Sequence, residues 1–125
     1  MKLIEMKRLL LIIASLFLGI IARGQVFYSN DLTHSKTGEQ ISGYVELTVN
    51  TDLQIVCLNY CDQRVFFKLV DIQVSEKNGL TILKYTIKNN DGYYYTFSVV
   101  ADDHSAVMVL TFLDVICQQV TIRRL

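Results

Sequence analysis

The sequence contains few of the residues from which metal sites and nucleophilic active sites are built. Its 125 residues include three cysteines and only two histidines, His34 and His104. A structural zinc site takes four ligands, of which histidine could supply at most two here. It also lacks a glycine-rich phosphate loop, a nucleophile elbow and a pair of histidines spaced along one helix. These absences predict a protein that is not an enzyme and that holds neither a metal nor a cofactor.

The densest polar cluster is Asp102-Asp103-His104-Ser105. Such a cluster could form a metal or acid–base site at a hairpin tip, but Asp and Ser also bond to the local backbone in ordinary turns. Four consecutive residues do not converge on one ligand, and the sequence supplies no accompanying nucleophile and base. We therefore expect a solvated turn here, and a surface histidine at His34.

There is no excess of positive charge either. The chain has twelve Lys or Arg and twelve Asp or Glu. Four of the positive residues and one of the negative residues lie within the first 24, which leaves eight positive and eleven negative charges, a net of −3. Nucleic acids and anionic membrane surfaces are bound by basic patches. The charge balance therefore argues against both as partners.

Residues 1–24 have the three-part layout of a signal peptide. A basic start is followed by an apolar run of fourteen residues, 9–22, and then by Ala22-Arg23-Gly24, with small residues three and one positions before a possible cut. A spanning helix needs about 20 apolar residues, which argues against the alternative of an uncleaved anchor. We expect a mature chain of 101 residues that begins at Gln25 and is secreted or periplasmic. The residue immediately after the cut is not a cysteine, and the first cysteine is Cys57, so no lipid anchor is expected.

Export would permit a disulfide, and the three cysteines, Cys57, Cys61 and Cys117, are all candidates. Along one straight strand Cys57 and Cys61 would lie about 13 Å apart, which is too far to bridge. A turn near Asn59 could bring them together, and Cys117 could pair with either one. The alternative is that the cysteines are small buried apolar residues.

The hydrophobic pattern predicts an all-β domain over residues 41–125, preceded at 25–40 by a short strand and a polar leader. Residues 41–49 alternate between apolar and polar side chains, as in a strand with one buried face. The short strand covers 26–28, and residues 29–40 read as a loop. No stretch has the spacing of an amphipathic helix. Further strands are predicted at 53–60, 64–76, 80–89, 93–101, 106–113 and 116–124.

Turn residues fix how these strands pair. Asn78-Gly79 is the strongest sequence signal for a two-residue type I′ hairpin turn. The residue pairs that follow from it are Lys77 with Leu80, Val74 with Leu83, Ile72 with Tyr85 and Val70 with Ile87. Because these pairs form one continuous apolar face, the sequence supports this register.

The next two turns agree on the same interior. Only a three-residue loop at 90–92, with Gly92 left-handed in a bulge, keeps the apolar faces matched. It pairs Ile87 with Tyr95, Tyr85 with Phe97 and Leu83 with Val99. A turn at Asp103-His104 then pairs Val99 with Met108, Phe97 with Leu110 and Tyr95 with Phe112. The last turn, near Asp114, leaves the register open; we expect Ile116, Val120 and Ile122 inside and Cys117 outside.

The predicted fold is an antiparallel up-and-down meander of about seven to eight strands, a count that follows from the alternation. Tight sequential hairpins favour a barrel-like or strongly curled sheet, with a β-sandwich as the alternative. The strand order resembles that of small secreted β-barrels and lipocalin-like domains. A barrel of this size has an interior just wide enough for side chains or one small ligand.

Tyrosines supply two candidate binding surfaces. Tyr85, Tyr95, Phe97 and Met108 fall on the predicted inner face and could line a site for a small apolar ligand. Tyr93 is predicted to point inward with them. Tyr44 and Tyr94 fall outside and could contact a protein or a glycan. The alternative is that these aromatic residues simply fill the core and its rim.

Two functions are consistent with these observations. The first is an exported, non-enzymatic binding or interaction module that uses its outer surface. The second is a carrier that holds a small apolar ligand in a lipocalin-like interior. Neither involves nucleic acid, and neither leaves a stable membrane anchor once the signal peptide is removed.

Overall fold

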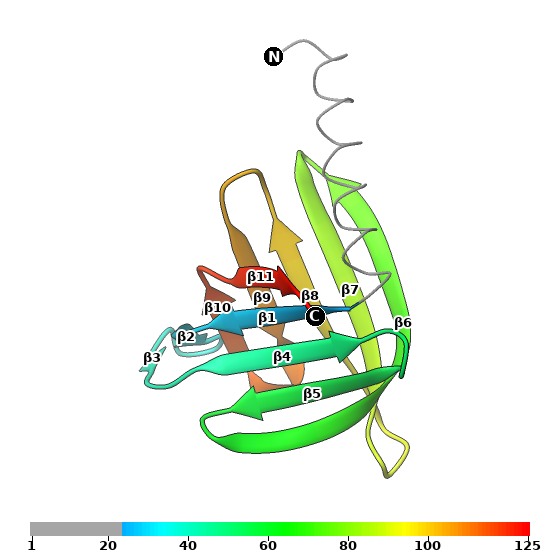
Figure 1. The fold of residues 1–125 in the computed structure, drawn as a ribbon. Coiled ribbons are helices and arrows are strands. Elements are labelled where there is room, and N and C mark those ends of the chain that lie inside the picture. Colours follow the sequence, from blue (N-terminus) through cyan, green and yellow to red (C-terminus); the bar gives the residue numbers. More distant parts are fainter. Residues whose placement is uncertain (1–23) are drawn as a thin grey trace, which may run out of the picture.

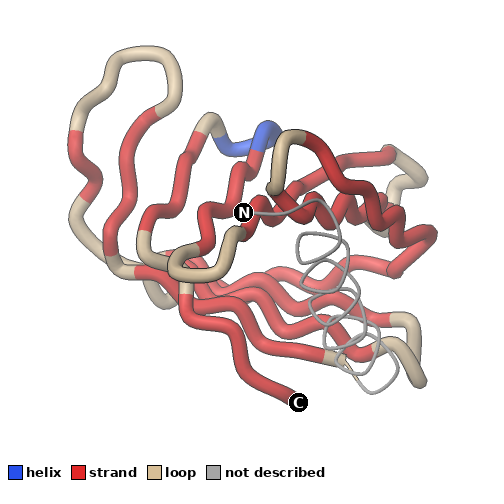
Figure 2. The backbone as a smooth tube through the Cα atoms, turned by 90° about the horizontal axis from the view of Figure 1, so that it is seen from above, coloured by secondary structure: helices blue, strands red, loops and turns tan. Residues whose placement is uncertain are grey.

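A computed structural model describes residues 24–125, which form one antiparallel sheet of eleven strands, strongly curled into a half-barrel (Figure 1). Viewed from above, the strands curve around an interior (Figure 2). None of the helices within residues 24–125 has the length and apolar character to cross a membrane. The predicted signal peptide lies almost wholly outside the described residues. The all-β meander predicted from the sequence is confirmed.

The strands follow one another along the chain with short connections. They are β1 (Gln25–Ser29), β2 (Asp31–His34), β3 (Gln40–Ile41), β4 (Val45–Asn50), β5 (Ile55–Tyr60), β6 (Gln63–Lys77), β7 (Leu80–Lys88), β8 (Tyr94–Ala101), β9 (Ala106–Leu110), β10 (Val115–Gln118) and β11 (Thr121–Arg124). A single 3-10 turn, η1 (Thr111–Leu113), lies between β9 and β10.

The sheet curls far enough for the first strands to pair with the last. Only Asn30 separates β1 from β2, yet β1 pairs with β4 and β11, and β2 pairs with β3 and β10. Three crossings of the sheet are each interrupted by a short break, so that each is made of two strands. These are β1 with β2, β3 with β4, and β10 with β11. The N-terminal crossing is therefore hydrogen-bonded on both sides, which leaves it no free edge along most of its length.

The Asn78-Gly79 hairpin confirms most of the predicted register. Lys77 lies opposite Leu80, Val74 opposite Leu83 and Ile72 opposite Tyr85. The predicted pairing of Val70 with Ile87 is wrong, because the register shifts between Leu69 and Asp71 and places Leu69 opposite Ile87. Val70 is the extra residue of this bulge, and it is 46% exposed.

The loop after β7 matches the prediction. Gly92 has a φ of 89°, and its backbone N–H donates to the Asn89 carbonyl (3.2 Å). Ile87 then lies opposite Tyr95, and Tyr85 opposite Phe97. The β8–β9 hairpin continues the same face with Phe97 opposite Leu110 and Val99 opposite Met108. The predicted strand pair of Tyr95 with Phe112 is replaced by a ring contact at 5.4 Å, because Phe112 lies in η1.

Two other predictions are wrong. Part of the supposed polar leader is strand: β2 pairs with β10 and buries Leu32 completely, and β3 pairs with β2. Near the C-terminus, Cys117 faces the core and Ile116 does not, because η1 and a left-handed Asp114 (φ 55°) set the opposite register. A left-handed Gln119 (φ 49°) follows, after which Val120 is buried as expected.

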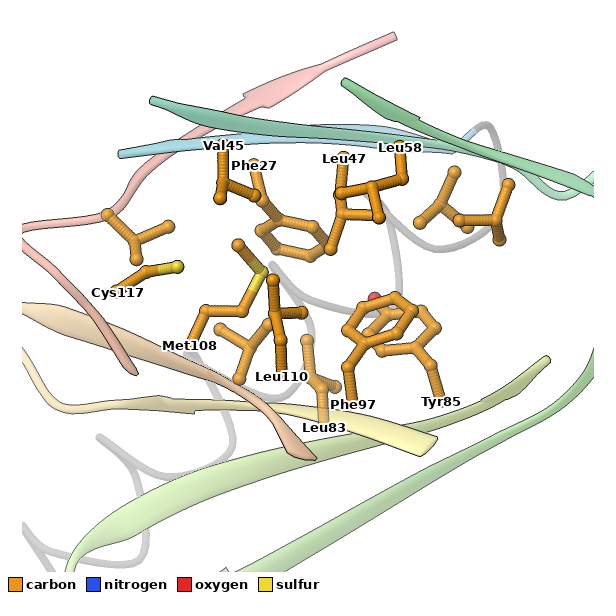
Figure 3. Close-up of a cluster of buried hydrophobic side chains, with 14 of the residues drawn as sticks. Phe27, Val45, Leu47, Leu58, Leu83, Tyr85, Phe97, Met108, Leu110 and Cys117 are labelled. Carbon is orange, nitrogen blue, oxygen red and sulfur yellow. The ribbon is translucent and has the colours of Figure 1, made fainter. Parts of the chain in front are cut away.

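The core is one apolar cluster that receives side chains from the inner face of the curled sheet (Figure 3). Its largest members include Phe27, Leu47, Tyr85 and Phe97, all fully buried. Tyr85 and Phe97 stack with ring centroids 4.6 Å apart, and Phe27 meets the edge of Tyr85 at 5.8 Å. Burial of each such side chain contributes roughly 1.5–3 kcal/mol, so this cluster is the main source of stability.

We expect Gly92→Val to destabilise the fold by about 1–3 kcal/mol, because a β-branched side chain is strained at a positive φ. Asp91→Val is the matched control, since Asp91 lies in the same loop without a positive φ. Urea unfolding of both variants measures the difference. An equal midpoint for the two valine variants would contradict the assignment of strain to Gly92.

Candidate functional site

The predicted inner binding residues come together, and they fill the interior. Tyr85, Phe97 and Met108 have no exposed surface, and they belong to one packed cluster (Figure 3). Tyr95 is half-buried and sits at the edge of that cluster. The same residues that could line a ligand site therefore pack against one another in this structure.

A polar contact lies inside this apolar cluster. The side-chain amide of Gln25 donates a hydrogen bond from Nε2 to the Tyr85 hydroxyl, and both residues are fully buried. The amide oxygen Oε1 of Gln25 is buried and has no partner within the described residues. Burial raises the pKa of Tyr85 far above its ordinary value, so this hydroxyl stays protonated. Sequence reasoning missed Gln25, although Gln25 lies on the same face of β1 as Phe27 and Ser29.

Three aromatic rings pack together at the margin of the core cluster. Phe67, Tyr95 and Phe112 meet in pairs, with ring centroids 5.4–6.1 Å apart. The Asn89 side chain donates to the Tyr95 hydroxyl at 3.3 Å. The prediction that Tyr93 points inward is wrong: it precedes β8 in the loop and is exposed, and its N–H donates to Asn89 Oδ1 at 2.9 Å.

The outer face carries a second candidate site, of which sequence reasoning identified only Tyr94. Cross-strand pairing places Ile55, Lys68, Lys88 and Tyr94 in one row across β5, β6, β7 and β8. Tyr94 is 61% exposed, as predicted, and the Lys88 ammonium lies 5.4 Å from the centre of its ring. This contact is a cation–π interaction on the surface.

A shallow groove of about 420 Å³ adjoins this row. Its walls are mainly apolar, with Leu53 and Phe66 68% and 57% exposed. The lining residues are Leu53, Gln54, Ile55, Phe66, Phe67, Lys68 and Asn90. We call these residues, together with Lys88 and Tyr94, the β5–β8 face. The sequence feature that indicates this site is that residues 53–60 are apolar on both faces of their strand, so the apolar residues of one face must lie outside.

Tyr44 does not join Tyr94. It is half-buried before β4, stacks on Tyr28 at 6.0 Å and donates to Asp62 at 2.9 Å. The hydrogen bond to the Asp62 carboxylate raises the pKa of Tyr44, because that bond holds the phenol protonated. The two tyrosines predicted as one contact surface therefore lie at opposite ends of β5.

The Asp102-Asp103-His104-Ser105 cluster forms a turn, as expected. The Asp102 carboxylate accepts hydrogen bonds from the backbone N–H groups of His104 and Ser105, both at 2.8 Å. These bonds hold the pKa of Asp102 below its ordinary value. Its carboxylate is thus occupied by the local backbone. His34 Nδ1 accepts a hydrogen bond from the backbone of Lys36 at 3.3 Å, which is also a turn contact.

The three cysteines are free thiols on different surfaces. Cys117 is fully buried on the inner face, where burial raises its pKa to about 12. Cys57 lies between Thr48 and Phe66, among the outward residues. Cys61 comes after the end of β5 and contacts the Ser42 carbonyl at 3.7 Å. The turn that could have joined Cys57 to Cys61 lies at 61–62, beyond Asn59, so β5 keeps them apart.

Residues 24–125 contain no cluster of three or more His, Cys, Asp or Glu able to hold a metal ion.

We expect Tyr85→Phe to lower the free energy of unfolding by about 1–3 kcal/mol, because it leaves the buried Gln25 amide without its partner. The control is the double variant Tyr85→Phe with Gln25→Met, which removes both polar groups and should recover much of the loss. Urea unfolding compares the three proteins. A single variant as stable as the parent would show that the buried hydrogen bond contributes nothing.

Comparison with protein-family models, with curated proteins and with solved structures finds no match for this chain. Its function is therefore argued from the geometry of its own residues.

Proposed function

We propose that this chain is an exported, non-enzymatic binding module whose β5–β8 face binds a protein segment that carries apolar side chains next to a carboxylate. The observation that carries the proposal is the apolar groove beside Lys68 and Lys88. The export half rests on the three-part layout of residues 1–24.

The exposed apolar residues of this face are contiguous and not scattered singly over the surface. Leu53, Ile55 and Phe66 are all exposed and line the same groove. Contiguous apolar surface on a folded protein marks interaction sites more often than scattered apolar residues do. An aromatic side chain such as Phe66 or Tyr94 is also a favoured anchor in protein interfaces.

Charge indicates the chemistry of the partner. Lys68 and Lys88 lie opposite each other on β6 and β7. Among residues 24–125, the ion pairs are Lys36 with Asp114 and Arg123 with Glu46, so neither lysine of the face is paired within the described chain. The two ammonium groups form a local positive site on a chain whose predicted mature charge is −3. A carboxylate of the partner would complement them.

Protein fits this face better than glycan. A sugar needs several hydrogen-bonding side chains around its hydroxyl groups, whereas this groove is lined mainly by Leu53, Ile55, Phe66 and Phe67. Aliphatic and aromatic side chains are best covered by others of the same kind. The occupant is therefore an apolar segment with one or two acidic residues.

A small-ligand carrier with a lipocalin-like interior is the second candidate. It is favoured by one observation, the unpaired Oε1 of Gln25 inside the apolar cluster. Against it, Tyr85 and Phe97 already stack face to face in the space that a ligand would occupy. A carrier would have to separate these rings, so the outer face is the better proposal.

A displayed library of random peptides, selected on the folded protein, tests the β5–β8 face. We expect enriched peptides to combine Asp or Glu with Leu, Phe or Tyr. Binding should weaken about tenfold or more in Phe66→Ser and in Lys68→Glu, because each removes a contact worth about 1.4 kcal/mol or more. Lys84→Glu is the matched control, since Lys84 is an exposed lysine on β7 outside the groove. Selected peptides that bind all three variants equally would refute the proposal.

Intact mass spectrometry tests export and separates the two candidate functions. We expect the denatured mass of the exported protein to correspond to a chain that begins at Gln25, and its native mass to carry no small molecule. A denatured mass that includes residues 1–24 would refute export by a cleaved signal. Extra mass in the native spectrum alone would place the carrier ahead of the binding module.

A further inference from the structure

The strand β6 is much longer than the strand beside it. It spans Gln63–Lys77, but β5 pairs only with its first part and ends at the pair of Ile55 with Lys68. The backbone N–H of Leu69 then donates to the Gln54 carbonyl at 2.8 Å. Within the part of the chain that the structure describes, residues 71–77 pair with β7 on one side and with no strand on the other. Figure 1 shows β6 and β7 running together to their turn.

We propose that two copies of this chain associate through this free edge, with residues 71–77 of each copy pairing antiparallel about a two-fold axis at Val74. Unpaired N–H and C=O groups along a strand edge are a template for another strand. An isologous dimer uses the same edge twice, so the edge must complement itself. The sequence of residues 71–77 satisfies this requirement in three ways.

The first is charge. A two-fold axis at Val74 sets Asp71 of one copy opposite Lys77 of the other, and the reverse pair forms on the far side of the axis. Opposite charges at directly facing positions stabilise an antiparallel pair, whereas like charges destabilise it. No other two-fold register places Asp71 opposite Lys77. A register centred on Glu76 would set two glutamates against each other.

The second is the direction of the backbone groups. In a two-residue hairpin the pair next to the turn, Lys77 with Leu80, is hydrogen-bonded. Bonding to β7 then alternates, so the N–H and C=O groups of Ile72, Val74 and Glu76 point toward the free edge. With the axis at Val74, these are the residues that face each other across the two copies. Asp71 and Lys77 fall in a non-hydrogen-bonded pair, where side chains approach most closely.

The third is shape. Beyond the end of the seven-residue segment, the turn Asn78-Gly79 of the second copy would lie next to Val70. A hollow of about 410 Å³ occupies that position. It is lined by Thr51, Asp52, Gln54, Leu69, Val70, Asp71 and Ile72. The second carboxylate there, Asp52, adds to the attraction for the incoming Lys77. Val74, which is 42% exposed in one copy, would be covered by its counterpart.

This dimer does not depend on the proposed β5–β8 face, because the free edge and the groove at Phe66 are separate parts of β6. The bulge at Val70 and the charges at 71, 76 and 77 are features that discourage indiscriminate pairing of an edge. In the register at Val74 the same charges at 71 and 77 become complementary, which makes the edge selective for a second copy.

A charge-reversal experiment on the exported protein tests the register. Sedimentation velocity over a range of concentrations should show a monomer–dimer equilibrium. Asp71→Lys and Lys77→Asp should each weaken it about tenfold or more, because each sets like charges opposite each other twice. An equimolar mixture of the two variants should recover association, since a heterodimer restores opposite charges at both positions. Native mass spectrometry identifies that heterodimer by its mass.

Two further variants keep the result interpretable. Lys84→Asp reverses an exposed lysine on β7, away from the edge, and should leave the equilibrium unchanged. Val74→Pro removes a backbone N–H that points away from β7, so it should abolish the dimer while the melting temperature shows that the fold persists. A chain that is monomeric at every soluble concentration overturns the proposal. So does a dimer that both charge reversals leave intact, or a mixture that forms no heterodimer.

Discussion

The fold depends on strand parity. Successive side chains of a strand point to opposite faces, so every turn and bulge must return the next apolar residue to the inner face. The core is one continuous cluster because the backbone irregularities preserve this order. Val70 is the extra residue of a bulge that keeps both Leu69 and Ile72 against the core, and the left-handed Gln119 returns Val120 to it. Without these adjustments, an apolar strand would face solvent.

The face that each side chain takes could be predicted where the conformation of the preceding turn requires a particular residue type. Asn78-Gly79 and Gly92 each require positive φ angles that few other residues accept, and the register around both turns is as predicted. The bulge at Val70 has no such signal, because a valine between Leu69 and Asp71 also fits a regular strand. At the C-terminus, Asp114 adopts a left-handed conformation that its sequence neighbours do not indicate, so alternation alone predicts the wrong face for Cys117.

The candidate sites were predictable to the same extent. The clear alternation of their strands predicts Tyr85, Phe97 and Met108 on the inner face, and all three are buried. Whether such residues hold a ligand or one another is decided by packing, which alternation does not describe. Apart from Tyr94, the outer site is not predicted, because Ile55 and Phe66 interrupt the apolar–polar alternation of their strands. A single sequence does not distinguish such an interruption from a chance substitution. Gln25 was missed because a polar residue on the inner face is uncommon.

Both proposed surfaces follow from the unequal lengths of neighbouring strands. The interior of the half-barrel is filled by its own side chains, so both proposed surfaces lie outside it, and most strand edges of the curled sheet are already paired. The strand β6 keeps a long stretch without a second partner, because it extends past the end of β5 at Ile55. At that point the β4–β5 turn lifts Leu53 into solvent beside Phe66, and beyond it the edge of residues 71–77 begins. One mismatch in strand length therefore produces an apolar groove on one side of the turn and an unpaired strand edge on the other.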